Sequence, residues 1–455
     1  MSETPIADVP PSGSIDVDKA PPASYPKPSY SWALIAFLTL AYVSSFIDRY
    51  ILGLLVDPIK ETTGASDTTM GFLFSAFNLT YAVIALPIGL LIDRRSRTKI
   101  VAIGIFLWSL ATVWTGLAKN LVQLFVARMS VGVGEAVLSP AAFSMIGDSF
   151  PKEKRGLPIA VYSMALVFGS ALANLIASVI LPWARDFGQI TMPLFGDLET
   201  WQFIFIIVGL PGFLLALVFL VFKEPARIES SPREGAKFTD AFVFVKNKAA
   251  VFITFVSIFM CMVAIAYGGG FNAPLFSRVW GWDPAIYARY NGLSLLFISP
   301  VVYLVFGWLS DKGMMKGIKD TPLRIAIAGL FVMIPAAIAF PLMSNVWAAF
   351  ALNILSNIGV GMISVTGVNA LLNIVPGDIR GFVVSLYYFC ISFIGGSLSP
   401  PMIGWINDTF YNGAGLQYAM AIYPIVFGLP VILLSPWTLK LYRRELAERL
   451  AAGED

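Results

Sequence analysis

The sequence predicts an all-α membrane protein in which twelve transmembrane helices form two pseudo-symmetric six-helix bundles. Three observations support this class: the composition, twelve apolar runs of membrane-spanning length, and an internal repeat. Hydrophobic residues account for 57% of the 455 positions and charged residues for 13%, whereas soluble domains average about 45–50% and about 25%. A chain of this composition belongs in a lipid bilayer.

The twelve apolar runs each supply the roughly 20 residues that a helix needs to cross a hydrocarbon core of ~30 Å. The first six lie at 31–56, 70–92, 99–117, 121–147, 156–182 and 201–222, and the second six lie at 249–275, 288–310, 323–342, 346–373, 381–405 and 417–438. The predicted domains are therefore an N-terminal bundle at 31–222 and a C-terminal bundle at 249–438. The charged segment 223–248 is predicted to be a cytoplasmic linker between them.

The two ends of the chain differ from the bundles. Residues 1–30 are rich in Pro, Ser and Asp and predict a disordered cytoplasmic tail. Residues 439–455 contain a basic amphipathic stretch, which predicts a short helix on the cytoplasmic membrane surface.

The distribution of Lys and Arg predicts the orientation. Most of these residues lie in the two tails and in the loops after the even-numbered spans. The opposite loops contain only Lys60, Lys119, Arg185, Arg278 and Arg289. Because basic loops favour the cytoplasm, we expect a multi-pass protein of a plasma or inner membrane with both termini cytoplasmic.

Two sequence segments of the first half recur in the second half. GLLIDRRSR at 89–97 recurs as GWLSDKGMM at 307–315, and FPKEKRGLPIAVY at 150–162 recurs as VPGDIRGFVVSLY at 375–387. Two parallel six-span repeats are a transporter architecture, with the substrate site between the halves near the membrane midplane.

Four charged residues stand out because they lie inside the predicted spans and away from the span ends: Asp48, Arg49, Arg128 and Glu135. Each costs about 2.5–3.5 kcal/mol at the centre of a membrane helix, so such residues usually face an internal cavity and pair with one another. We predict that Asp48 or Glu135 exchanges a proton, while Arg49 and Arg128 alternate between a carboxylate and an anionic substrate. The alternative is a fixed ion-pair cluster that joins spans 1 and 4.

The second half lacks an equivalent charged pair. In the repeat, Arg128 corresponds to Asn353 and Glu135 to Val360, so proton coupling is predicted to reside in the first half. Polar and aromatic residues within the spans are candidates for a substrate cavity, although each could instead serve helix packing. These candidates are Tyr162, Asn174, Tyr267, Phe271, Asn272, Asn353, Asn357 and Tyr387.

A charged loop follows span 2. Asp93 lies there with Arg94 and Arg97, and its counterpart in the repeat is Asp311. A carboxylate that faces the positive N-terminus of a neighbouring helix would form a conformational latch. The alternative is a set of solvated charges that fix only the orientation.

Several classes of function are disfavoured by what the sequence contains. It has no histidine, only two cysteines within apolar spans, and no Ser-Lys constellation, so an intramembrane enzyme, a metal site or another cofactor is not expected. The net charge of +3 is small and dispersed, which argues against nucleic-acid binding. We expect a monomer whose partners are the bilayer, protons and an anionic substrate.

These residues resemble a known family. GLLIDRRSRTK resembles the loop signature of the major facilitator superfamily, and RMSVGVGEA resembles its span-4 motif. Within that superfamily, FIDRY, RMSVGVGEA and IGDSFPKEKRG resemble the spinster-type lipid transporters. The resemblance implies alternating access by a rocker switch and, in some members, proton-linked movement of lysolipids or sphingosine phosphates.

Carried over to this sequence, the resemblance assigns Asp48 and Arg49 to the charged pair of span 1, and Arg128 and Glu135 to that of span 4. Two features depart from the pattern. Ser96 stands where the loop motif usually has Gly, and FGSALAN at 168–174 lacks the Gly-Pro pattern of many proton antiporters.

The preferred prediction is a proton-coupled secondary transporter of an amphipathic anionic or zwitterionic lipid-like substrate, of the sphingosine-phosphate or lysolipid class. Its head would bind near Arg49 and Arg128, and its tail against aromatic residues of the second half. The alternative within transport is a proton-linked symporter of a small organic anion. The alternative from another class is a non-transporting membrane receptor or sensor.

Overall fold

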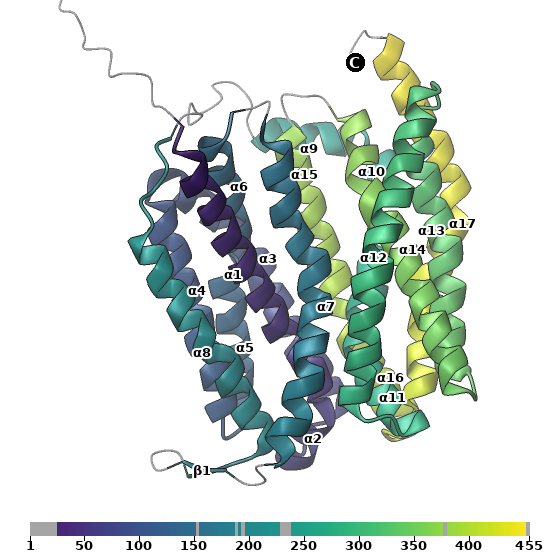
Figure 1. Ribbon diagram of the computed structural model, residues 1–455. Coiled ribbons are helices and arrows are strands. Elements are labelled where there is room, and N and C mark those ends of the chain that lie inside the picture. Colours follow the sequence, from purple (N-terminus) through teal and green to yellow (C-terminus); the bar gives the residue numbers. More distant parts are fainter. Residues whose placement is uncertain are drawn as a thin grey trace, which may run out of the picture.

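The computed structural model describes residues 25–151, 154–186, 190–192, 196–227, 238–375 and 380–451. Among them are twelve helical spans that are long and apolar enough to cross a membrane, and Figure 1 shows them as two adjacent bundles. The predicted fold class is therefore confirmed. The predicted N-terminal tail lies largely outside the described residues.

The first half contains six of these spans. Its helices are α1 (Pro28–Leu54), α2 (Val56–Thr63), α3 (Asp67–Arg94), α4 (Arg97–Leu117), α5 (Leu121–Glu135), α6 (Leu138–Ser149), α7 (Gly156–Asp186) and α8 (Thr200–Val221). An antiparallel hairpin of β1 (Ile190–Met192) and β2 (Gly196–Leu198) precedes α8.

The second half begins with α9 (Phe238–Asn247), a helix within the predicted linker. The remaining elements are α10 (Ala249–Gly268), η2 (Gly269–Phe271), α11 (Asn272–Trp280), α12 (Pro284–Met315), α13 (Thr321–Ala339), η3 (Phe340–Leu342), α14 (Val346–Ile374), α15 (Arg380–Cys390), the π-helical segment η4 (Ile391–Gly396), α16 (Ser397–Tyr411) and α17 (Leu416–Ala451).

Three of the predicted spans are interrupted. The fourth span breaks between Glu135 and Leu138, because Pro140 has no N–H to donate to the carbonyl of Ala136. The seventh span breaks at η2, a stretch that contains two consecutive glycines. In the eleventh span the irregular segment is η4, which precedes Pro400.

The C-terminal tail differs from the prediction. The amphipathic stretch after residue 438 does not form a separate helix but continues α17, which runs for 36 residues without a break. Tyr442 explains the continuity, because its side chain is fully buried and its hydroxyl donates to the carbonyl of Ala370. Residues 452–455 lie outside the described part of the chain.

The two halves meet along two helix pairs, α3 with α16 and α7 with α12. We call the end at which α1 begins and α17 finishes the terminal end, and the opposite end, near α2 and α11, the distal end (Figure 1). Hydrogen bonds and ion pairs between described residues of the two halves occur between the distal end and the level of the cavity described below, as the bonds of Arg278, Asn407, Asp408, Asp283 and Asn291 illustrate. None joins described residues of the two halves at the terminal end. The distal end is thus the closed end.

Candidate substrate cavity and charged cluster

The four charged residues that stand out within the predicted spans form two ion pairs between α1 and α5. Arg49 contacts Glu135, with Nε and Nη2 lying 2.7 and 2.5 Å from Oε2. Arg128 Nη1 lies 3.2 Å from Asp48 Oδ1. The structure thus brings together the four residues that the sequence singled out, and adjacent residues of α1 pair with residues two helical turns apart on α5.

Thr112 of α4, which the sequence analysis did not identify, completes the contacts of Asp48. Its hydroxyl donates to Asp48 Oδ2 over 2.8 Å, so both oxygens of Asp48 have a partner. Glu135 is different, because Oε1 is buried and has no hydrogen-bond partner among the described residues. The two carboxylates are therefore not equivalent: each oxygen of Asp48 has a partner, whereas one oxygen of Glu135 has none among the described residues.

The two arginines also differ in their surroundings. The Arg49 side chain is 19% exposed, whereas that of Arg128 is 2% exposed. The Arg49 guanidinium carbon lies 4.8 Å from the ring centre of Phe77, with Phe46 and Tyr81 also within cation–π range. Arg49 is thus the accessible cation of the cluster, held between a carboxylate and aromatic faces.

Glycines position α5 against its neighbours. A Cβ atom at Gly132 would lie 2.6 Å from the carbonyl oxygen of Phe77 on α3, and one at Gly134 would lie 2.7 Å from the backbone nitrogen of Trp108 on α4. Real Cβ atoms do not approach so closely, so only glycine permits this packing. The VGVGEA segment therefore brings Glu135 into the centre of the first bundle.

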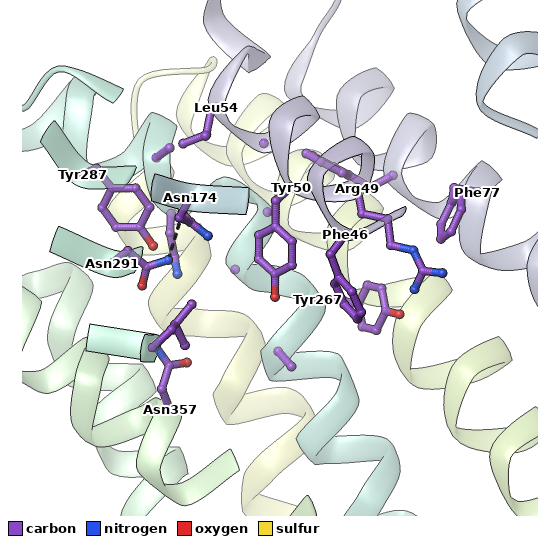
Figure 2. Close-up of a pocket in the computed structure, with 18 of the residues that line it drawn as sticks. Phe46, Arg49, Tyr50, Leu54, Phe77, Asn174, Tyr267, Tyr287, Asn291 and Asn357 are labelled. Atoms are coloured by element: carbon purple, nitrogen blue, oxygen red, sulfur yellow. Dashed lines mark hydrogen bonds between the residues drawn. The ribbon is translucent and has the colours of Figure 1, made fainter. Parts of the chain in front are cut away.

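A cavity of about 330 Å³ lies between the two halves. Arg49, Arg128, Phe46 and Phe77 line it from the first half. Figure 2 shows the arginine and aromatic side chains grouped apart from the amide side chains, with Tyr50 between them. The labelled amide group consists of Asn174, Asn291 and Asn357, with Tyr287 beside them. Asn272 also lines the cavity. The cavity thus has a cationic, aromatic wall and an amide-rich wall.

Four of the eight predicted cavity residues line this cavity: Asn174, Tyr267, Asn272 and Asn357. Asn272 carries a buried acceptor, Oδ1, that has no hydrogen-bond partner among the described residues.

The other four predicted residues do not line this cavity. Tyr162 stacks on Tyr42, with ring centres 5.1 Å apart, and Phe271 is fully buried against Phe74. Tyr387 packs on Phe259, and Asn353 is buried without lining the cavity. The reason is that an aromatic or amide residue within a span can face the helix-packed core as readily as a cavity.

Two lining residues of α12, Tyr287 and Asn291, were missed by the sequence analysis. Asn291 Nδ2 donates to Asn174 Oδ1 over 3.2 Å and so connects the two halves at the cavity wall. A polar residue at the start of an apolar run was the available signal for Asn291. Tyr287 carried none, because it precedes the predicted span.

Of the predicted latch residues, the structure describes the side chains of Arg97 and Asp311. Arg97 is buried and binds Asp148 and Glu224, and it also donates to the Pro225 carbonyl. Asp311 is exposed at the other half's terminal end and forms no ion pair with a described residue. Asp93 and Arg94 belong to α3, but their side chains lie outside the described part of the structure. Arg97 instead ties α4 to α6 and to the start of the linker.

A duplicated twelve-helix fold with a charged central cavity defines a membrane transporter. The family model of the Major Facilitator Superfamily matches residues 38–400. The chain belongs to this superfamily, and it is a multi-pass integral membrane protein and a transporter, not an enzyme.

Individual relatives refine the comparison. The crystal structure of a bacterial homolog to the human lysosomal transporter Spinster, inward-facing and unoccupied, is similar with a TM-score of 0.79 and 25% identity, covering 92% of this chain and 99% of that one. A probable L-galactonate transporter of Escherichia coli is 27% identical over 82% of this chain and 83% of its own length. The sphingosine-1-phosphate transporter SPNS2 of Mus musculus is 36% identical over 33% of this chain and 28% of its own. The chain is therefore spinster-like, and its relatives differ in the substrates that their names give.

Proposed function

We propose that this protein is a proton-coupled secondary carrier that moves a small polar organic anion by alternating access. The observation that carries the proposal is the unequal pair at Arg49. This arginine is the accessible cation of the cavity, and its partner Glu135 keeps one buried oxygen without a hydrogen bond.

The pairing suggests how a proton and an anion would be linked. With Glu135 ionised, Arg49 is neutralised by Nε and Nη2 contacts to one oxygen. A proton on Glu135 would remove that neutralisation and leave Arg49 free to bind a carboxylate or phosphate. The proton and the anion would then bind together and be carried in the same direction, which is symport. Their charges cancel, so the net charge of the cluster would be the same when loaded as when empty.

Asp48 has a different role in this proposal. Its two oxygens are already occupied by Arg128 and Thr112. We assign it to positioning α1 against α4 and α5, and we assign the proton to Glu135.

The amide-rich wall supports a polar substrate over a long acyl chain. Asn272, Asn291 and Asn357 can each donate and accept hydrogen bonds, as hydroxyl groups of a sugar acid would require. Two of the aromatic residues that were predicted to hold a lipid tail, Phe271 and Tyr387, face the core instead. The probable L-galactonate transporter, similar over 82% of this chain, is named for a sugar acid, which supports an anion at Arg49.

An amphipathic lipid anion remains the second candidate. The observation that favours it is the apolar part of the lining, formed by Phe46, Tyr50, Leu54, Phe74 and Leu295. Similarity to a sphingosine-1-phosphate transporter over a third of the chain points the same way.

We also propose that both termini are cytoplasmic, as the distribution of basic residues predicts. The closed distal end would then face outward, and the described conformation would be inward-facing. We further propose that the carrier acts as a monomer.

The test is a flux measurement in proteoliposomes with a trapped pH dye. L-galactonate, sphingosine-1-phosphate and a lysolipid are added separately to wild type, Glu135→Gln and Asp48→Asn. The proposal expects galactonate to drive proton flux in wild type, none in Glu135→Gln, and reduced but proton-linked flux in Asp48→Asn.

Two results would contradict it. Equal proton flux in wild type and Glu135→Gln would remove Glu135 from the coupling. Flux driven by the lipids and not by galactonate would favour the second candidate.

A further inference from the structure

The contact between α3 and α16 at the distal end contains a helix cap that crosses the two halves. The backbone N–H groups of Asp67 and Thr68, at the start of α3, donate to Asp408 Oδ1 and Oδ2 of α16 over 3.3 and 2.7 Å. The first N–H groups of a helix have no partner within the helix, and the helix dipole favours an anion there. Asp408 of the second half thus accepts hydrogen bonds from backbone N–H groups of the first half that have no partner within their own helix.

Hydrogen bonds in the reverse direction, donated by α3 to α16, lie two to three helical turns deeper. Pro400 and Pro401 have no N–H, so the carbonyls four residues earlier, those of Gly396 and Ser397, lose their usual donors. Asn78 Nδ2 of α3 donates to the Gly396 carbonyl over 3.3 Å, and Ser75 Oγ donates to the Ser397 carbonyl over 2.6 Å. Each helix therefore supplies hydrogen bonds that the other lacks.

Glycines let the two backbones touch. A Cβ atom at Gly71 would lie 2.4 Å from the Pro400 carbonyl oxygen, and one at Gly404 would lie 2.2 Å from the Asp67 carbonyl oxygen. No side chain larger than hydrogen fits at these two positions. At these two positions the contact is therefore made between the two backbones.

An ion-pair network closes the same end. The Asp67 carboxylate is fully buried and accepts two hydrogen bonds from Arg278 of α11, at 2.7 and 2.9 Å, and others from Lys60 and Asn407. Arg278 also contacts Asp57 of α2. Removing one partner of a buried pair is costly because it leaves an uncompensated charge.

We propose that the cap of Asp408 on α3, together with the hydrogen bonds that Ser75 and Asn78 return to α16, holds the distal gate of the carrier closed, and that Asp408 is the residue that controls it. The proposal rests on the alternating access proposed above. When the distal end opens, Asp408 must leave the N-terminus of α3, and water must replace the exchanged hydrogen bonds on both helices. The ion pair of Arg185 with Asp283 also joins the halves there, but its side chains are 43% and 38% exposed. Exposed pairs contribute little, so this pair is not the gate.

A distance measurement between the halves tests the proposal without any substrate. Spin labels are attached at Lys119→Cys and Ser344→Cys, two exposed distal positions in different halves, after Cys261 and Cys390 are replaced by serine. The labelled protein is placed in lipid nanodiscs and its distance distribution is recorded. Closed and open distal ends give a short and a long distance.

Asp408→Ala is expected to raise the ratio of long to short distances about fivefold, as the loss of a helix-capping side chain typically would. Asp408→Asn keeps an acceptor oxygen and is expected to shift the ratio less. Ser75→Ala removes the hydrogen bond that α3 donates to the Ser397 carbonyl of α16. It is expected to shift the distance ratio in the same direction, which keeps the test valid if Asp408→Ala does not fold.

Two matched controls set the background. Arg185→Ala removes the exposed pair between the halves, and Glu61→Ala removes an exposed carboxylate of α2 that forms no ion pair with a described residue. The gate assignment is overturned if Asp408→Ala and Ser75→Ala shift the ratio no more than these controls. If they shift it as expected while no anion moves in the flux assay, the gate stands and the proposed function fails.

Discussion

The two halves share one helical plan but differ in the chemistry of their fourth spans. In the first half, this span carries Arg128 and Glu135 and breaks into α5 and α6 directly after Glu135. In the second half, α14 runs for 29 residues without a break and has Asn353 and Val360 at the corresponding positions. Duplication thus preserved the scaffold while the charged cluster resides in one copy only.

This difference indicates that proton coupling and substrate recognition can reside in different halves of such a carrier. An ion pair responds to a proton because one of its members can be neutralised. An amide has no charge to lose, so the amide-rich wall offers hydrogen bonds that do not depend on pH. We therefore expect coupling to follow changes in the first half and substrate preference to follow changes in the second.

The largest effect is expected from Arg49→Ala. It removes the accessible cation of the cavity and leaves Glu135 buried without a partner, so galactonate uptake should fall by about 100-fold or more. Arg49→Lys keeps the charge but not the planar fork and should retain part of the uptake. Radiolabelled uptake into proteoliposomes measures both, with elution from a sizing column as the check on folding. Near-normal uptake by Arg49→Ala would remove the cationic wall from substrate binding.

A smaller effect is expected from the amide-rich wall. Asn357→Ala and Asn272→Ala should each raise the KM for galactonate by about three- to tenfold, the usual cost of one lost hydrogen bond. The number of protons moved per anion should stay the same, because Glu135 and Arg49 are untouched. Parallel uptake and pH recordings separate the two quantities. A change in the proton ratio would show that the halves do not divide the tasks in this way.

The smallest effects concern the terminal-end ion pairs of the two halves. Burial raises the pKa of Glu224, but hydrogen bonds from Ser96 and Arg97 outweigh it and hold the pKa below its usual value. Burial likewise raises the pKa of Asp320, and Arg324 and Arg443 outweigh it. Both groups should therefore stabilise the fold above the usual carboxyl pKa and lose this contribution as the pH falls through their lowered values.

Alanine variants test how much Glu224 and Asp320 each stabilise the fold. At pH 7 we expect Glu224→Ala to lower the melting midpoint by about 4 °C and Asp320→Ala by about 2 °C, because Arg97 is buried whereas Arg443 is half exposed. Both differences from wild type should shrink below about pH 4. Thermal unfolding in detergent at several pH values measures them, and a difference that persists in acid would contradict the electrostatic origin.

The sequence was sufficient for the twelve spans and for the meeting of spans 1 and 4. Charges inside apolar runs need partners, and Asp48, Arg49, Arg128 and Glu135 had few choices. It was not sufficient for the distal gate, because Asp67, Arg278 and Asp408 lie at helix ends, where charged residues are ordinary. An apolar run also does not show which face of its helix meets the cavity. The sequence therefore could not show that Asn291 lines this cavity while Phe271 and Tyr387 lie outside it.

The uninterrupted α17 has a practical consequence for imaging. A helix of 36 residues is about 54 Å long at 1.5 Å per residue, well beyond a ~30 Å hydrocarbon core. Arg443 and Tyr442 anchor the protruding part to the second bundle. A small rigid protein fused in helical register after Ala451 would therefore turn with that bundle and could serve as a fiducial mark for cryo-electron microscopy.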